Sequence, residues 1–305
     1  MKALKYWPVY RKFIQWANRN FPVTICKMRF YKIFGRKLNL KNPKDLNEKI
    51  LWLSLMSDTT EWSRLADKYA VREYVKENSL ENILVKLYGK WNRVEDIDWN
   101  TLPQSFVIKT NNGAGTVMVV NDKNKLDIDK TKKIINKWLI KDISSSTTEF
   151  HYQKIKPCII AEELLELSEI DKSISSSIID YKIWCFNGKA DSILVCSNRQ
   201  ENSCALSVYD LEWNYHPEVS IFNKEHFERD TLVPRPKHLE KMIDIAEKLA
   251  RNFPQVRIDL YNTNDKIYFG EMTFTSLGGT MTYYTQKELL RMGQKIDISN
   301  VKKIR

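Results

Sequence analysis

Apolar residues recur every three or four positions in several stretches of the chain, and this spacing predicts amphipathic helices. The pattern extends over residues 45–56, 60–78, 127–139 and 238–252. Asp45 precedes the first of these stretches and is a candidate N-cap, because its carboxylate can accept a hydrogen bond from the first helical turn.

Other segments are short, rich in β-branched residues and in part alternate in steps of two, as strands do. They cover residues 105–109, 116–120, 157–165, 179–186, 189–197, 204–209, 256–261 and 267–273. Residues 166–178 are polar and rich in serine, so we expect a mobile loop there. Strand pairs interspersed with helices indicate an α+β fold whose sheets are covered on one side.

Bulk composition is that of an ordinary globular protein, with 43% hydrophobic and 29% charged residues in 305. No run approaches the roughly 18 apolar residues of a membrane span, and the first residues lack the apolar stretch of a secretory signal. The five cysteines form no Cys-x-x-Cys pair, and the four histidines show no metal-ligand spacing. We therefore expect a reduced, cytoplasmic protein without structural zinc.

The net charge of +11 is concentrated at the N-terminus. Residues 1–44 contain twelve Lys and Arg and no Asp or Glu, which leaves a net charge of −1 for residues 45–305. Aromatic residues are interspersed with these basic ones, a combination that suits an anionic membrane surface or an acidic glycan. A solvated, partly docked helical segment is the alternative. Nucleic acid is the least favoured partner, because no nucleic-acid-binding motif is present.

A lysine and a glycine-rich loop follow each other in the segment Phe106–Gly115. Lys109 would leave the preceding strand beside Gly113 and Gly115, whose backbone N–H groups can approach phosphate oxygens closely. An Asn-Asn-Gly sequence is also typical of a hairpin turn. The segment is not a Walker loop, because no Gly-Lys-Ser/Thr follows.

Two carboxylates stand near the C-terminus on segments that we expect to be adjacent strands. Asp259 and Glu271 share a face of the sheet only if the connection has an odd number of residues or a bulge is present. If they converge they can bind Mg²⁺, and Arg257 can neutralise a transferred phosphoryl group. The alternative is an ordinary hairpin with a salt bridge between Arg257 and an acid.

A third segment, Ile159–Leu165, is an apolar strand that ends in two acids, and Asp180 and Lys182 follow it. The backbone edge of such a strand can bind an adenine, while a carboxylate accepts from its amino group and a later acid binds the ribose. By itself the segment is also an ordinary strand with polar ends.

These segments together resemble the TupA-like ATP-grasp family, which is linked to bacterial surface-polysaccharide and teichuronopeptide synthesis. The resemblance runs in order from about residue 38 to residue 284. The segments that carry it are Leu65–Arg72, Phe106–Gly115, Ile160–Leu165, Asp180–Lys182, Cys185–Gly188, Val256–Tyr261 and Ile267–Phe274.

The resemblance implies a role for individual residues. Phosphate contacts would come from Lys68, Lys109, Gly113 and Gly115. Adenine would lie against Glu162, Glu163 and Leu165, and ribose against Asp180. The Mg²⁺ ligands would be Asp259, Glu271 and Thr273, the last standing where many ATP-grasp enzymes have asparagine. The catalytic side chains would be Arg257, Lys109 and Lys182. Substrate contacts would come from Arg199, Ser276, Gly278, Gly279 and Thr280.

The same resemblance implies a domain plan. We expect a basic, aromatic-rich arm at residues 1–44, an ATP-grasp domain at 45–292 and a tail at 293–305. Within the domain, a smaller lobe at about 60–160 and a larger lobe at about 161–292 would enclose the nucleotide.

The expected function is that of a Mg-ATP-dependent carboxylate–amine ligase that acts through an acyl phosphate. It would join an amino acid or another amine to a uronic-acid carboxylate of a surface glycan or its lipid-linked precursor, in the cytoplasm or at the inner face of the plasma membrane. One alternative is a glycosyltransferase, for which Asp96-Ile-Asp98 is a candidate metal motif. Another is a non-catalytic scaffold at the membrane.

Overall fold

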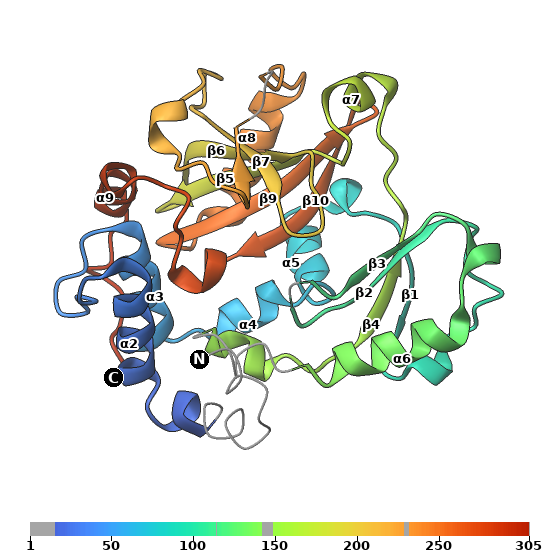
Figure 1. The fold of residues 1–305 in the computed structure, drawn as a ribbon, viewed down its shortest axis with the longest axis horizontal. Helices are drawn as coiled ribbons and strands as arrows, with labels where there is room; N and C mark the ends of the chain where they lie inside the picture. The colour runs from blue at the N-terminus through green and yellow to red at the C-terminus, as the bar shows by residue number, and fades with distance from the viewer. Residues whose placement is uncertain (1–15, 114, 142–148, 229–231, 305) are drawn as a thin grey trace.

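Two β-sheets form the framework of the protein (Figure 1). The computed structural model describes residues 16–113, 115–141, 149–228 and 232–304. A four-stranded antiparallel sheet has the order β1-β4-β2-β3, with strands Leu87–Trp91, Ile159–Glu162, Phe106–Thr110 and Val117–Val120. A six-stranded sheet has the order β10-β9-β5-β6-β7-β8, with strands Lys266–Thr273, Gln255–Thr263, Asp180–Phe186, Lys189–Ser197, Cys204–Tyr209 and His226–Phe227. The α+β prediction is confirmed.

The smaller sheet buries one face against helix α6, Ile128–Leu139. Side chains alternate along β2, so Phe106 and Ile108 pack with Ile135 of α6 while Lys109 points to the opposite face. Asp127 is the N-cap of α6 and accepts a hydrogen bond from the Lys130 backbone at 2.9 Å. This packing leaves one face of the sheet for a ligand.

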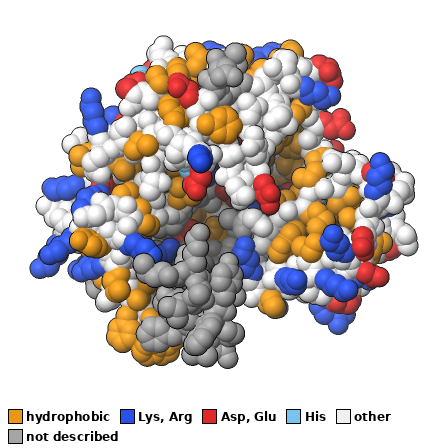
Figure 2. All heavy atoms as spheres, viewed as in Figure 1, with side chains coloured by type: hydrophobic (Ala, Val, Ile, Leu, Met, Phe, Trp, Pro, Cys, Tyr) orange, Lys and Arg blue, Asp and Glu red, His pale blue; other side chains and the backbone are white. Residues whose placement is uncertain are grey.

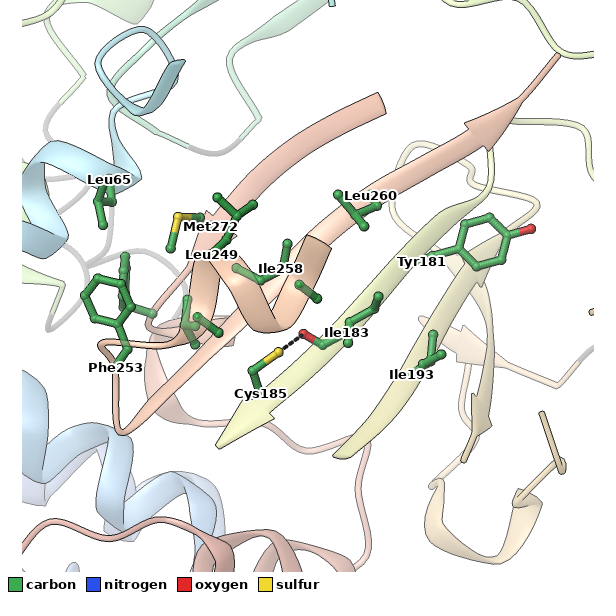
Figure 3. Close-up of a cluster of buried hydrophobic side chains, with 14 of the residues drawn as sticks. Leu65, Tyr181, Ile183, Cys185, Ile193, Leu249, Phe253, Ile258, Leu260 and Met272 are labelled. Atoms are coloured by element: carbon green, nitrogen blue, oxygen red, sulfur yellow. Dashed lines mark hydrogen bonds between the residues drawn. The ribbon is translucent and has the colours of Figure 1, made fainter. Parts of the chain in front are cut away.

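The larger sheet buries one face against helix α8, Leu239–Ala250, and Figure 3 shows part of this core. Val256, Ile258 and Leu260 of β9 enter it, and apolar residues of β5 and β6 join them. Because strand side chains alternate, Arg257 and Asp259 project from the other face. The same pattern that builds the core therefore places charged groups opposite it.

The N-terminal helices pack on the larger sheet. Helix α2, Pro22–Phe34, buries Cys26 and Phe30 in the same core as β9. Helix α3, Leu46–Met56, packs against α9, Gln286–Lys295. Asp45 is the N-cap of α3, as predicted, and accepts from the Glu48 N–H at 2.9 Å. Across the residues that the structure describes, no helix combines the length and apolar character needed to cross a bilayer.

Two sequence-based predictions were wrong. The helix expected over 60–78 is divided into α4, Thr60–Ala66, and α5, Val71–Glu77, because Asp67 accepts hydrogen bonds from the Tyr69 and Ala70 N–H groups and forms a turn. The stretch 166–178, expected to be a loop, contains helix α7, Glu169–Ile174.

Helix α7 begins with a capping box between Ser168 and Asp171. The Asp171 carboxylate also accepts from the Thr263 hydroxyl of β9 at 2.7 Å, which ties the helix to the larger sheet. Short 3₁₀ helices occur at Glu81–Ile83, Val94–Asp96, Lys123–Lys125, Phe150–Lys154, Pro217–Val219 and Ser276–Gly279, and residues 16–20 are also helical.

Candidate active site

Asp259 and Glu271 are directly paired across β9 and β10. A two-residue turn joins these strands, since Thr263 pairs with Lys266, and that turn alone would place Asp259 opposite Gly270. The register shifts between Phe269 and Glu271, so β10 contains a bulge. A Cβ at Gly270 would lie 2.9 Å from the Asp259 carbonyl oxygen, which explains the glycine. The bulge puts both carboxylates on one face.

Asp259 is a buried carboxylate bound by two cations. Arg257 donates to its two oxygens at 2.7 and 2.8 Å, and Lys182 of the neighbouring strand β5 donates at 2.6 Å. Arg257 also reaches the hydroxyl of Thr273 at 3.2 Å and that of Ser276. Burial lowers the pKa of Arg257, but Asp259 more than reverses this, and the pKa of Arg257 lies well above its usual value.

Glu271 is the more accessible of the paired acids, with 41% of its side chain exposed. The Thr273 hydroxyl donates to it at 3.1 Å, and the Lys68 ammonium lies 3.4 Å away. Burial raises the pKa of Glu271, but the charges of Lys68, Lys182 and Arg257 outweigh it and lower that pKa to about 2. Glu271 is therefore ionised at neutral pH.

Lys68 connects the two halves of the site. It lies in the turn between α4 and α5 and donates to the Gly113 carbonyl of the glycine loop at 3.0 Å, while it also contacts Glu271 of the larger sheet. Gly115 has a φ of +68°, a conformation that suits glycine. Lys68 and the glycine loop, which sequence analysis assigned to phosphate binding, therefore lie next to the paired carboxylates.

Lys109 and Glu162 form an ion pair of 2.5 Å on the face of the smaller sheet that is opposite α6. Arg72 of α5 also contacts Glu162 at 3.1 Å and donates to the Val85 carbonyl at 2.8 Å. The Glu163 N–H donates to the Lys86 carbonyl. The roles of Glu162, Glu163 and Leu165 toward adenine remain predictions.

Val117 and Val119 of β3 are about half exposed on the same face as Lys109. Tyr261 and Tyr268, paired with each other on β9 and β10, lie on the carboxylate face of the larger sheet. Exposed apolar side chains next to cations suit a purine ring attached to phosphates. Sequence analysis missed these valines, because the run Val-Met-Val-Val indicates a strand but not which side is exposed.

Asp180 and Arg199 form an ion pair at the far end of β5, and Lys182 lies 3.4 Å from the same carboxylate. Asp180 pairs with Tyr261 and Lys182 pairs with Asp259 across β5 and β9. These four side chains therefore lie on one face of the larger sheet. Arg199, predicted to contact the substrate, therefore lies at the end of the site predicted to hold ribose. Both roles remain predictions.

In the loop after β10, one predicted substrate residue lies at the site and others have contacts within the fold. Ser276 contacts Arg257 and therefore lies at the site. Gly279 packs so closely against α3 that an added Cβ would lie 2.8 Å from the Leu51 side chain. The Thr280 hydroxyl donates to the Leu277 carbonyl. The glycine thus has a packing reason that is independent of any substrate.

Asn111 and Glu149 are site neighbours that sequence analysis missed. The Asn111 side-chain amide donates to Asp67 at 2.8 Å and accepts from the Cys158 N–H at 2.7 Å, while the Asn111 backbone carbonyl accepts from the Lys68 N–H. Glu149 accepts from the Thr275 hydroxyl at 2.6 Å beside the 276–280 loop. Asn111 lies in the segment Phe106–Gly115 and Glu149 in no motif, but the role of each depends on contacts distant in sequence.

The donor set around Asp259 and Glu271 fits magnesium better than a softer metal. In the described ranges no three His, Cys, Asp or Glu side chains gather as a metal cluster. Two facing carboxylates and the Thr273 hydroxyl offer only oxygen, and Mg²⁺ completes such a partial set with phosphate oxygens and water. Such a site depends on a phosphate ligand.

Comparison with known proteins adds a family. The sequence model of the TupA-like ATPgrasp family matches residues 48–297. No curated protein matches the chain.

Among solved structures, the D-alanine–D-alanine ligase of Bacillus anthracis complexed with ATP is 12% identical, with a TM-score of 0.47 over 78% of this chain and 64% of the ligase. The chain thus spans less than two thirds of that protein. The L-amino acid ligase of Bacillus licheniformis is 12% identical, with a TM-score of 0.42 over 72% of this chain and 43% of that one.

Proposed function

The chain belongs to the TupA-like ATP-grasp family, and on this basis we propose that it is an ATP-dependent ligase that joins a carboxylate to an amine. A carboxylate oxygen of one substrate attacks the γ-phosphorus of ATP, ADP leaves, and an acyl phosphate forms. The amine nitrogen then attacks the acyl carbon, phosphate leaves, and the nitrogen loses a proton to solvent. The product is an amide.

The observation that carries this proposal is the contact between Lys68 and Glu271, which joins the glycine loop to the paired carboxylates. Lys68, Lys109 and Arg257 offer positive charge where a phosphoryl group would pass, and preorganised charge of this kind stabilises such transition states. Mg²⁺ bound by Asp259, Glu271 and Thr273 would neutralise phosphate charge. Lys182 holds Asp259 in place through its 2.6 Å contact.

We place the acceptor carboxylate near Ser276, because that hydroxyl contacts the Arg257 guanidinium, which is also bound to Asp259. A uronic acid of a surface glycan or its lipid-linked precursor is the proposed acceptor, and an amino acid the proposed amine. The family's link to surface-polysaccharide synthesis supports this choice. Since ATP is the energy source, the reaction is proposed to occur in the cytoplasm or at the inner face of the plasma membrane.

The structure favours the ligase over a glycosyltransferase. Asp96 of the candidate Asp-x-Asp motif pairs with Arg93 at 2.5 Å, and the Asp98 carboxylate accepts from the Asn100 N–H in a turn. Both acids thus have local structural roles.

ADP release against a panel of uronic acids and amino acids, with products identified by mass spectrometry, tests the proposal. ADP, phosphate and an amide product formed in equal amounts are expected. Release of a nucleoside diphosphate from a sugar nucleotide without ATP consumption would show a glycosyltransferase instead. Failure to bind adenine nucleotides in calorimetry would leave the scaffold alternative.

A further inference from the structure

Helix α2 carries apolar side chains on two opposite sides. Cys26 and Phe30 are buried in the core, whereas Met28, Tyr31 and the N-cap residue Phe21 are 63%, 58% and 52% exposed. At about 100° per residue, Met28 lies roughly 160° around the helix axis from Phe30. A helix at the edge of a soluble core normally presents polar residues outward, so the outer side of α2 needs a different explanation.

Basic residues flank this outer side. Lys27 and Lys32 are exposed next to Met28 and Tyr31, and no acid occurs anywhere in residues 1–44. Trp16 is also half exposed and contacts Phe21 edge to face at 5.6 Å. Orange and blue side chains lie side by side at the lower left of Figure 2, where Figure 1 places α2.

Helix α6 provides an internal comparison. It also presents exposed lysines, including Lys133 and Lys137, but Asp127 and Asp129 stand at its first turn. Ile140, just after its end, is its exposed large apolar neighbour. Exposed lysines with nearby acids are typical of a solvated helix face. The combination of an exposed apolar row with acid-free basic flanks distinguishes α2.

We propose that the outer side of α2, formed by Phe21, Met28 and Tyr31 with Lys27 and Lys32 beside them, docks the protein on an anionic phospholipid bilayer. The apolar side chains enter the headgroup region while the lysines contact lipid phosphates. The helix lies in the plane of the interface. Charge complementarity favours this occupant over a neutral surface or a second copy of a chain with net charge +11. The inference does not depend on the proposed reaction.

Sedimentation of the full chain with phosphatidylglycerol-containing vesicles and with pure phosphatidylcholine vesicles tests this surface. Two double variants remove its two components: Met28→Asp with Tyr31→Asp, and Lys27→Glu with Lys32→Glu. The controls are Ile170→Asp, at a residue that is 73% exposed on α7, and Lys133→Glu with Lys137→Glu on α6. The second control changes the net charge by the same amount as the lysine pair on α2.

Wild type is expected to bind the anionic vesicles, less so at high salt, and each α2 variant to lose at least about tenfold in affinity. The controls should change little, and melting temperatures should stay close to wild type because every changed side chain is exposed. Equal binding to both vesicle types, or equal losses from the α2 and α6 lysine pairs, would overturn the proposal. So would an oligomer without vesicles that the Met28 and Tyr31 changes dissociate, since that result identifies a second copy as the occupant.

Discussion

Asp259 and Glu271 face each other across two strands that are joined by a two-residue turn. That turn would place them on opposite faces, and Gly270 prevents this because it is the extra residue of the bulge. The candidate metal site therefore depends on one residue that has no side chain and binds nothing.

Substitution of Gly270 by alanine should disrupt the pairing of the two carboxylates. The added Cβ would lie 2.9 Å from the Asp259 backbone oxygen, which real Cβ atoms do not tolerate, so β10 must move. We expect a loss of stability of about 1–3 kcal/mol and a loss of at least about tenfold in ATP turnover. Turnover and thermal unfolding are measured together.

Gly35→Ala is the control for the loss of a glycine as such. Gly35 has a φ of +66° after α2, and an added Cβ there meets no atom within 4 Å. That variant should lose stability without a comparable loss of turnover at a temperature where it is folded. Normal activity in Gly270→Ala would show that the bulge does not set the site.

Glu271→Gln separates catalysis from stability better than any change of Asp259. Asp259 binds two buried cations, so its neutralisation removes the carboxylate nearest to both Arg257 and Lys182 and should cost about 3–5 kcal/mol. Glu271 is 41% exposed and contacts Lys68 and Thr273 at more than 3 Å. Its neutralisation should lower turnover by on the order of a hundredfold, with a smaller loss of stability than neutralisation of Asp259 causes.

Glu169→Gln is the matched control, because that carboxylate is 89% exposed on α7. Wild-type turnover in Glu271→Gln at saturating Mg-ATP would exclude Glu271 as a metal ligand.

The lowered pKa of Glu271 also predicts that the stability of the protein depends on pH. Its folded pKa of about 2 lies below the ordinary value of 4.5, so its stabilising effect is complete above about pH 5 and disappears as the pH falls toward 2. The difference in stability between wild type and Glu271→Gln should shrink over that range.

Periodicity in the sequence predicts the α+β class and the face of the sheet on which several charged side chains lie. The alternation that buries Val256 and Ile258 also projects Arg257 and Asp259 to the opposite face, so both follow from one pattern. The relation between Asp259 and Glu271 could be stated only as a condition, because residue types do not show where a strand gains an extra residue.

Helix α7 and the exposure of Val117 could not be predicted from the sequence, each for its own physical reason. Helix α7 is short and polar, and its stability comes from the Ser168–Asp171 capping box and the contact with Thr263, not from an apolar face. Val117 looks like a core residue in the sequence, and only the position of α6 on the other side of the sheet leaves it exposed. Such features depend on contacts between distant segments.

Asn111→Ala should weaken ATP binding without removing any predicted ligand of the nucleotide. The side chain joins Asp67 to the Cys158 N–H, and the adjoining backbone holds Lys68. Loss of the amide leaves a buried N–H unsatisfied, which costs about 1–3 kcal/mol, and loosens the turn that positions Lys68. The KM for ATP should rise by roughly tenfold. Asn124→Ala, at an exposed position, is the control, and an unchanged KM in a less stable protein would show a purely structural role.

His151 should make the protein acid-sensitive below the ordinary histidine pKa. The ring is buried between Trp62 and Tyr152, and among the residues that the structure describes neither ring nitrogen has a hydrogen-bond partner. Burial lowers the pKa of His151 from 6.5 to about 3, so the folded state keeps the ring neutral while the unfolded state takes up a proton. A depressed folded pKa means that stability is complete above pH 6.5 and falls by up to about 1.4 kcal/mol per pH unit between 6.5 and 3.

His151→Phe keeps an aromatic ring against Trp62 and Tyr152 but removes the titrating group. The free energy of unfolding, measured by denaturant titration at several pH values, should therefore fall less steeply with acidification in the variant than in wild type. His216→Phe is the control, because that partly exposed imidazole pairs with Asp210 and Glu218 and its pKa is raised. Its removal should leave the slope assigned to His151 in place. If wild type and His151→Phe lose stability in parallel between pH 6.5 and 4, the buried ring is not the source of the acid sensitivity.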